Sequence, residues 1–130
     1  MRLQLNLNKY YEGLDKAQIN TLFSLFVNSK YVINDVSRQM NRLKEDTYQP
    51  TEVAQLHHII SRERALRAFK AINDYMRSLG KEEIFKGVDT DDIEEVDFES
   101  LINQYNYLMS KPDETQTEGW PESKEAIDNR

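Results

Sequence analysis

Apolar residues recur every three or four positions through most of the chain, which is the spacing of one face of an α-helix. The first such stripe runs from Asp15 to about Lys44. It predicts a single helix about 45 Å long, at ~1.5 Å per residue, with Phe26 at its centre. Asp15 can cap this helix together with Gln18 three residues later. The alternative is a break at Asn28-Ser29, where the stripe is weak.

A second helical stretch covers residues 51–79, but its apolar phase changes partway along. Val53, Leu56 and Ile60 form one set, and the set centred on Phe69 lies roughly 150° away when both are placed on one helical wheel. Either one helix is buried on two sides, or the chain breaks near residues 58–61 and Ser61 begins a second helix. We favour the break.

The signals that begin and end helices agree with these limits. Thr51 is the expected N-cap of the second stretch, and Gly80 is the expected left-handed residue that ends it. Apolar positions from Phe98 to Met109 repeat at three and four and predict a last helix over residues 97–110.

The N-terminus follows a different period. Leucines alternate with polar residues over positions 3–7, which predicts a short half-buried strand. A lone strand needs a partner, and the best candidate within the chain is the segment 83–88; another chain is the alternative. The predicted fold is therefore mainly α: a small three- or four-helix domain over residues 1–111, with a short N-terminal β-strand.

Residues 112–130 are mostly polar, and we expect a disordered acidic C-terminal tail there. The tail contributes to a marked charge asymmetry. Residues 1–81 hold 13 Lys and Arg against 8 Asp and Glu, whereas residues 82–130 hold 4 against 15. A basic body with an acidic tail is typical either of a nucleic-acid-binding protein or of an interaction tail, and a solvated tail without a target is the plain alternative.

Composition excludes several classes of function. The chain has no cysteine, so it has no disulfide, thiol nucleophile or thiolate metal site, and we expect a reducing, cytoplasmic location. No segment approaches ~18 consecutive apolar residues, and the N-terminus lacks the apolar stretch of a signal peptide. We therefore expect no membrane association.

No set of residues has the spacing of an active site. His57 and His58 are adjacent and point about 100° apart on a helix, so they do not form a chelate. The acidic run at residues 89–95 starts like a calcium loop but has Ile93 and Glu94 where an oxygen ligand and a glycine are required. The four glycines are scattered and form no phosphate cradle. We expect no cofactor, no metal and no enzymatic activity.

Basic residues gather in the second helical stretch. If Ser61 began a second helix, residues 51–79 would form a helix-turn-helix, and four residues near the start of its recognition helix could contact DNA or a partner: Arg62, Arg64, Arg67 and Lys70. Against this, the turn has no glycine, and i,i+4 pairs of Glu63 with Arg67 and of Lys70 with Asp74 would make this face a salt-bridged surface.

The interpretation that remains is a non-enzymatic helical protein that binds another macromolecule as an adaptor, regulator or inhibitor. A protein partner is expected, and a homodimer is one way to cover the long first helix. A helix-turn-helix DNA-binding regulator that uses residues 51–79 is the alternative.

Overall fold

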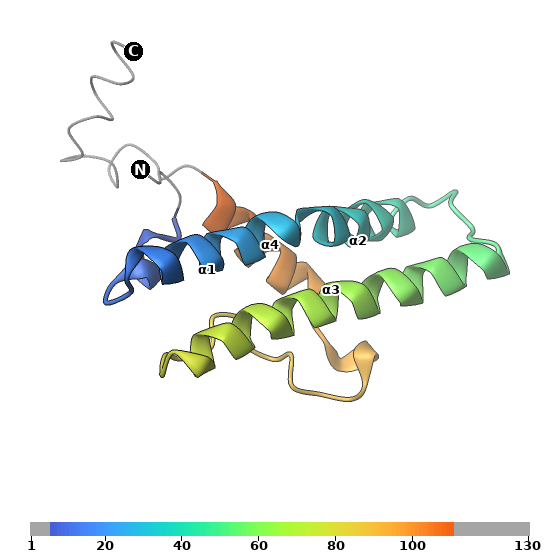
Figure 1. Cartoon of the computed structure of the whole chain (residues 1–130). Coiled ribbons are helices and arrows are strands. Elements are labelled where there is room, and N and C mark those ends of the chain that lie inside the picture. Colours follow the sequence, from blue (N-terminus) through green and yellow to red (C-terminus); the bar gives the residue numbers. More distant parts are fainter. Residues whose placement is uncertain (1–5, 111–130) are drawn as a thin grey trace, which may run out of the picture. The chain divides into compact units, whose positions relative to one another are not determined.

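The structure is a computed structural model, and it describes residues 6–110 (Figure 1). The protein is mainly helical, as the hydrophobic pattern predicts. Its α-helices are α1 (Lys16–Asn28), α2 (Lys30–Leu43), α3 (Glu52–Ser78) and α4 (Phe98–Met109), with short 3-10 helices at Asn8–Tyr11 and Ile93–Glu95. The described residues divide into two compact units, one of residues 14–104 and one that joins residues 6–13 with 105–110.

The helix signals predicted at Asp15, Thr51 and Gly80 are confirmed. Asp15 forms a capping box at α1: its carboxylate accepts from the Gln18 amide at 2.9 Å, and the Gln18 side chain accepts from the Asp15 amide at 3.0 Å. Thr51 Oγ1 accepts from the Ala54 amide at 3.1 Å and caps α3. Gly80 follows α3 with φ of 76°, a left-handed conformation that a side chain would strain.

The single long helix predicted from Asp15 to Lys44 is wrong, because the chain breaks at Ser29. The Ser29 hydroxyl donates to the Leu25 carbonyl at 2.7 Å, in competition with the backbone bonds of that turn. Such back-bonding bends helices. The two resulting helices, α1 and α2, follow one another along α3 (Figure 1).

The break predicted near residues 58–61 is also wrong, since α3 is one helix from Glu52 to Ser78. Ser61 does not cap a helix; its hydroxyl donates to Asp35 on α2 at 2.8 Å. With no turn inside residues 52–78, α3 does not form a helix-turn-helix.

The segment 83–88 is not a strand, and the described residues 6–110 contain no strand at all. The backbone of this segment is bound not by another strand but by the side chain of Asn73, which is fully buried on α3. Its side-chain oxygen accepts from the amides of Ile84 and Phe85 at 2.9 Å each, and its side-chain nitrogen donates to the Phe85 carbonyl at 2.7 Å. Most of the predicted strand at residues 3–7 and all of the predicted tail at residues 112–130 lie outside the described residues.

Three aromatic rings form the centre of the 14–104 unit. Phe26 on α1 and Phe69 on α3 are fully buried, which confirms their predicted central places in the stripes. The ring of Phe85 lies between them, with centroids 5.8 Å from Phe26 and 4.7 Å from Phe69. The connector after α3 therefore contributes to the core that the helices share.

In the other unit, Asn6 fixes the N-terminal segment to the end of α4. Its side-chain nitrogen donates to the Tyr107 carbonyl at 2.8 Å, and its amide donates to the Ser110 carbonyl at 3.3 Å. Tyr11 and Tyr105 are both buried in this unit. None of the helices within residues 6–110 has both the length and the hydropathy needed to cross a bilayer.

Asn73 gives the first test of this fold. We expect Asn73→Ala to lower the free energy of unfolding by about 3 kcal/mol or more, because three buried backbone groups would lose their partner at ~1–3 kcal/mol each. Chemical denaturation measures the effect. The matched control is Asn20→Ala on the exposed side of α1, which should change stability by less than about 0.5 kcal/mol. Equal effects for the two variants would contradict the role of Asn73.

The buried tyrosines predict how stability responds to alkaline pH. Burial raises the pKa of Tyr11 to about 12 and that of Tyr105 to about 12, from 10.0. The folded state therefore retains these protons when the unfolded state loses them, so stability is lost as pH rises from 10 to 12. Denaturation across this range should show a steeper loss for the wild type than for a Tyr11→Phe, Tyr105→Phe double variant. Tyr31→Phe, at an exposed position, should follow the wild type.

Candidate functional site

The first half of α3 carries an apolar row that the described part of the chain leaves uncovered. Val53 is 64% exposed, Leu56 59% and Ile60 45%, at the i, i+3, i+7 spacing of one helix face. The buried residues of the same helix, from Ser61 through Phe69 to Met76, lie on the opposite side. We define the outer face of α3 as Val53, Leu56, Ile60, Arg64 and Arg67.

The inner side of the same half-helix is occupied by a polar network. On α2, Gln39 bridges to α3: its oxygen lies 2.7 Å from His58 Nδ1, and its nitrogen donates to Ser61 Oγ at 2.9 Å. Asp35 accepts from both Ser61 and Gln39, at 2.8 Å and 3.2 Å. His58 Nε2 lies 3.3 Å from the hydroxyl of Tyr48. These bonds fix α3 with its polar residues inward, and they direct the apolar row to solvent.

This network also explains the histidine pair. His58 is buried within it, whereas His57 is exposed. Within residues 6–110 no group of three or more His, Cys, Asp or Glu side chains is placed to hold a metal ion.

Two of the four basic residues singled out from the sequence belong to the outer face. Arg64 and Arg67 are exposed and lie one to two turns beyond Ile60. The expected pairs of Glu63 with Arg67 and of Lys70 with Asp74 are not formed in this part of the chain. Asp74 pairs with Arg77 instead, at 2.6 Å. Arg77 also holds Glu83 at 2.8 Å and Asp89 at 3.4 Å.

Arg64 and Arg67 are therefore free to meet an outside carboxylate, while the acidic connector uses Arg77. Lys70 is half-buried further along α3.

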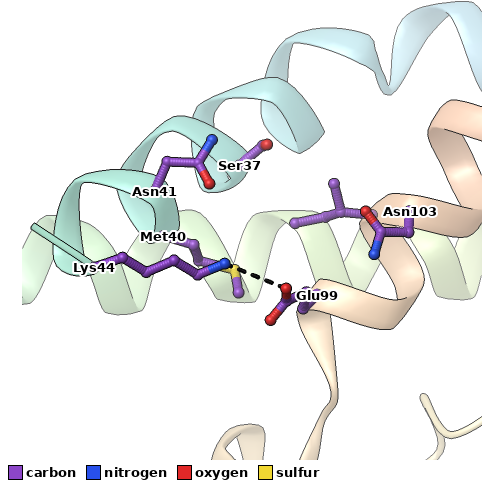
Figure 2. A pocket seen from close by; sticks show the side chains of 7 residues that line it. Ser37, Met40, Asn41, Lys44, Glu99 and Asn103 are labelled. Atoms are coloured by element: carbon purple, nitrogen blue, oxygen red, sulfur yellow. Dashed lines mark hydrogen bonds and ion pairs between the residues drawn. The ribbon is translucent and has the colours of Figure 1, made fainter.

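Arg62 points away from the outer face, into a hollow between α2, α3 and the start of α4. The hollow has a volume of about 340 Å³ and is lined by Met40, Leu43, Arg62, Val96, Asp97, Phe98 and Glu99. A smaller hollow of about 60 Å³ shares Met40 and Glu99 with it. Figure 2 shows this neighbour, in which Lys44 reaches from α2 to Glu99 on α4 at 3.2 Å.

The apolar part of the outer face was not identified as a site from the sequence. The signal was present in the 150° offset between the two apolar sets, at 100° per residue, but an offset of this kind also fits a broken helix. Only the continuity of α3 shows that the first set faces away from the core.

No protein-family model matches this chain, and neither does any curated protein or solved structure.

The exposure of the outer face can be tested with one substitution at two sites. We expect Leu56→Ala to change the free energy of unfolding by less than about 0.5 kcal/mol, because the side chain has little burial to lose. Leu22→Ala, at a fully buried position of α1, should cost about 2–5 kcal/mol. Chemical denaturation compares them. A cost above about 2 kcal/mol for Leu56→Ala would mean that another part of the chain covers this face.

Proposed function

We propose that this protein is a non-enzymatic adaptor, regulator or inhibitor that binds a partner protein through the outer face of α3. The observation that carries the proposal is the exposed row of Val53, Leu56 and Ile60, on the side of the helix opposite its core. Exposed apolar groups at i, i+3 and i+7 are the usual anchors by which an amphipathic helix enters an apolar groove.

Charge specifies the chemistry of the partner. The apolar row is followed on the same face by Arg64 and Arg67, which have no carboxylate partner among the described residues. Residues 62–70 hold four basic side chains and one acidic side chain, Glu63. The partner surface that fits is an apolar groove with carboxylates beyond one end, which would steer association and set the direction of binding.

A second copy of this chain fits the face less well. In a two-fold antiparallel pair, each edge of one helix meets the same edge of the other. Glu52 and Glu63 lie along one edge of the outer face, and His57 and Arg64 lie along the other. Glutamates would therefore face glutamates along one side of the apolar row, which opposes pairing.

The test compares what full-length variants retain from an extract of the native host. Leu56→Asp and the double variant Arg64→Glu, Arg67→Glu each disrupt one half of the outer face. Tyr31→Asp on α2 is the apolar control, since Tyr31 is 87% exposed. Lys16→Glu with Lys30→Glu is the charge control, at exposed positions of α1 and α2.

We expect a protein whose retention, measured by mass spectrometry, falls at least about 10-fold with both face variants, and remains unchanged with both controls. The purified partner should reproduce this order of affinities. The proposal fails if no retained protein distinguishes the face variants from the controls. A wild-type dimer that Leu56→Asp dissociates would instead favour the second copy.

DNA binding is the alternative from a different class, and the same basic residues test it. We expect duplex DNA to bind no tighter than ordinary non-specific affinity, ~10⁻⁴ to 10⁻⁶ M near physiological salt. Fluorescence anisotropy with the wild type and with the Arg62, Arg64, Arg67 triple alanine variant measures this. Nanomolar binding that the triple variant abolishes would make DNA the ligand of these arginines.

A further inference from the structure

The outer face of α3 has no partner of opposite charge among residues 6–110. Arg64 and Arg67 are exposed next to the apolar row and form no ion pair within this part of the chain. In the acidic connector between α3 and α4, the carboxylate of Asp89 pairs with Arg77 instead, at 3.4 Å. Carboxylates that match the outer face therefore come from another part of the chain or from a partner.

Residues 112–130 have the composition that matches this face. They hold six acidic and two basic side chains, so the segment carries a net charge of −4. Its large apolar residues are Trp120 and Ile127, and Glu118 and Glu122 lie two positions to either side of Trp120. The segment thus combines apolar side chains with carboxylates, which are the two features of a partner surface that fits the outer face.

Residues 1–5 also lie outside the described range, but they match the outer face less well. They are rich in leucine, yet their only charged side chain is that of Arg2. Its guanidinium group would meet those of Arg64 and Arg67, and like charges oppose binding. Charge therefore favours the C-terminal segment over the N-terminal one.

The length of the C-terminal segment also suits the outer face. From Val53 to Arg67 the face is about 21 Å long, at ~1.5 Å per residue. The nineteen residues of the segment can extend to about 60 Å, at ~3.3 Å per residue. A tethered segment acts at an effective concentration in the millimolar range, so a contact of only millimolar affinity covers the face in about half of the chains.

We propose that residues 112–130 bind the outer face of α3, with Trp120 on the apolar row and its neighbouring carboxylates on Arg64 and Arg67, and that they compete there with the partner protein. The competition rests on the function proposed for this face, whereas the contact itself does not. Covering the face in about half of the chains lowers the apparent affinity for the partner about 2-fold. Coverage of this extent stabilises the fold too little to change the result expected for Leu56→Ala.

The chain's single tryptophan, Trp120, reports on this contact in the full-length protein. Acrylamide quenches the fluorescence of an exposed indole, and a synthetic peptide of residues 112–130 gives the exposed reference. We expect the quenching constant of the full-length protein to be about half that of the peptide, because the face covers the indole in about half of the chains. The constant should not change on about 100-fold dilution, since a contact within one chain does not depend on concentration.

Variants assign the contact to the outer face. Leu56→Asp and the double variant Arg64→Glu, Arg67→Glu should each raise the quenching constant about 2-fold, to that of the peptide. The apolar and charge controls of the partner experiment, at exposed positions of α1 and α2, should leave it unchanged. A wild-type constant equal to that of the peptide would overturn the proposal, and this comparison needs no variant to fold. So would a low constant that persists in Leu56→Asp, or one that rises on dilution, which would indicate a second copy.

Reversing the charge of the segment tests the competition. Glu118→Lys with Glu122→Lys should raise the quenching constant and increase retention of the partner from the extract about 2-fold. Glu82→Lys with Glu94→Lys, at exposed positions between α3 and α4, is the matched control and should change neither. Raised quenching with unchanged retention would refute the competition. The two proposals fail separately, because quenching needs no partner: if no retained protein distinguishes the face variants, the proposed function fails and the quenching result stands.

Discussion

The side chain of Asn73 is the interaction on which the 14–104 unit depends. Its amide satisfies two backbone N–H groups and one carbonyl of the connector, so the chain can enter the core without an unpaired polar group. That entry places the ring of Phe85 between Phe26 and Phe69. One buried amide thereby holds the connector against α3, and Phe85 extends this attachment to Phe26 on α1.

A second polar constraint governs the other end of α3. Here α2 and α3 are joined by hydrogen bonds among four polar side chains: Asp35, Gln39, His58 and Ser61. The interface between these two helices is therefore polar at this end. Buried polar networks are stable only when their members are paired, and this pairing fixes the rotation of α3 about its axis. The apolar row on the outer face is a consequence of that rotation.

The composition of the outer face of α3 follows from these constraints. Arg64 and Arg67 continue the apolar row along one face. Arg62, two positions before Arg64, lies on another side because successive helix residues are rotated by about 100°. Neighbours in the sequence thus lie on different surfaces: Arg64 and Arg67 are exposed beside the apolar row, whereas the partly buried Arg62 lines a hollow together with Asp97 and Glu99.

Local signals in the sequence determined the helical class and the helix ends at Asp15, Thr51 and Gly80. They also determined the central places of Phe26 and Phe69. Each of these features depends on a few neighbouring residues or on a simple period. Tertiary structure decided the rest. The residues around Ser61 predict a helix cap there, but its hydroxyl donates to the carboxylate of Asp35, 26 residues earlier in the chain. The pattern of segment 83–88 predicts a strand, but the buried side-chain amide of Asn73 on α3 forms the hydrogen bonds to its backbone. Hydrophobic periodicity does not predict hydrogen bonds between residues far apart in the sequence. These bonds decided which apolar residues were buried and which remained exposed.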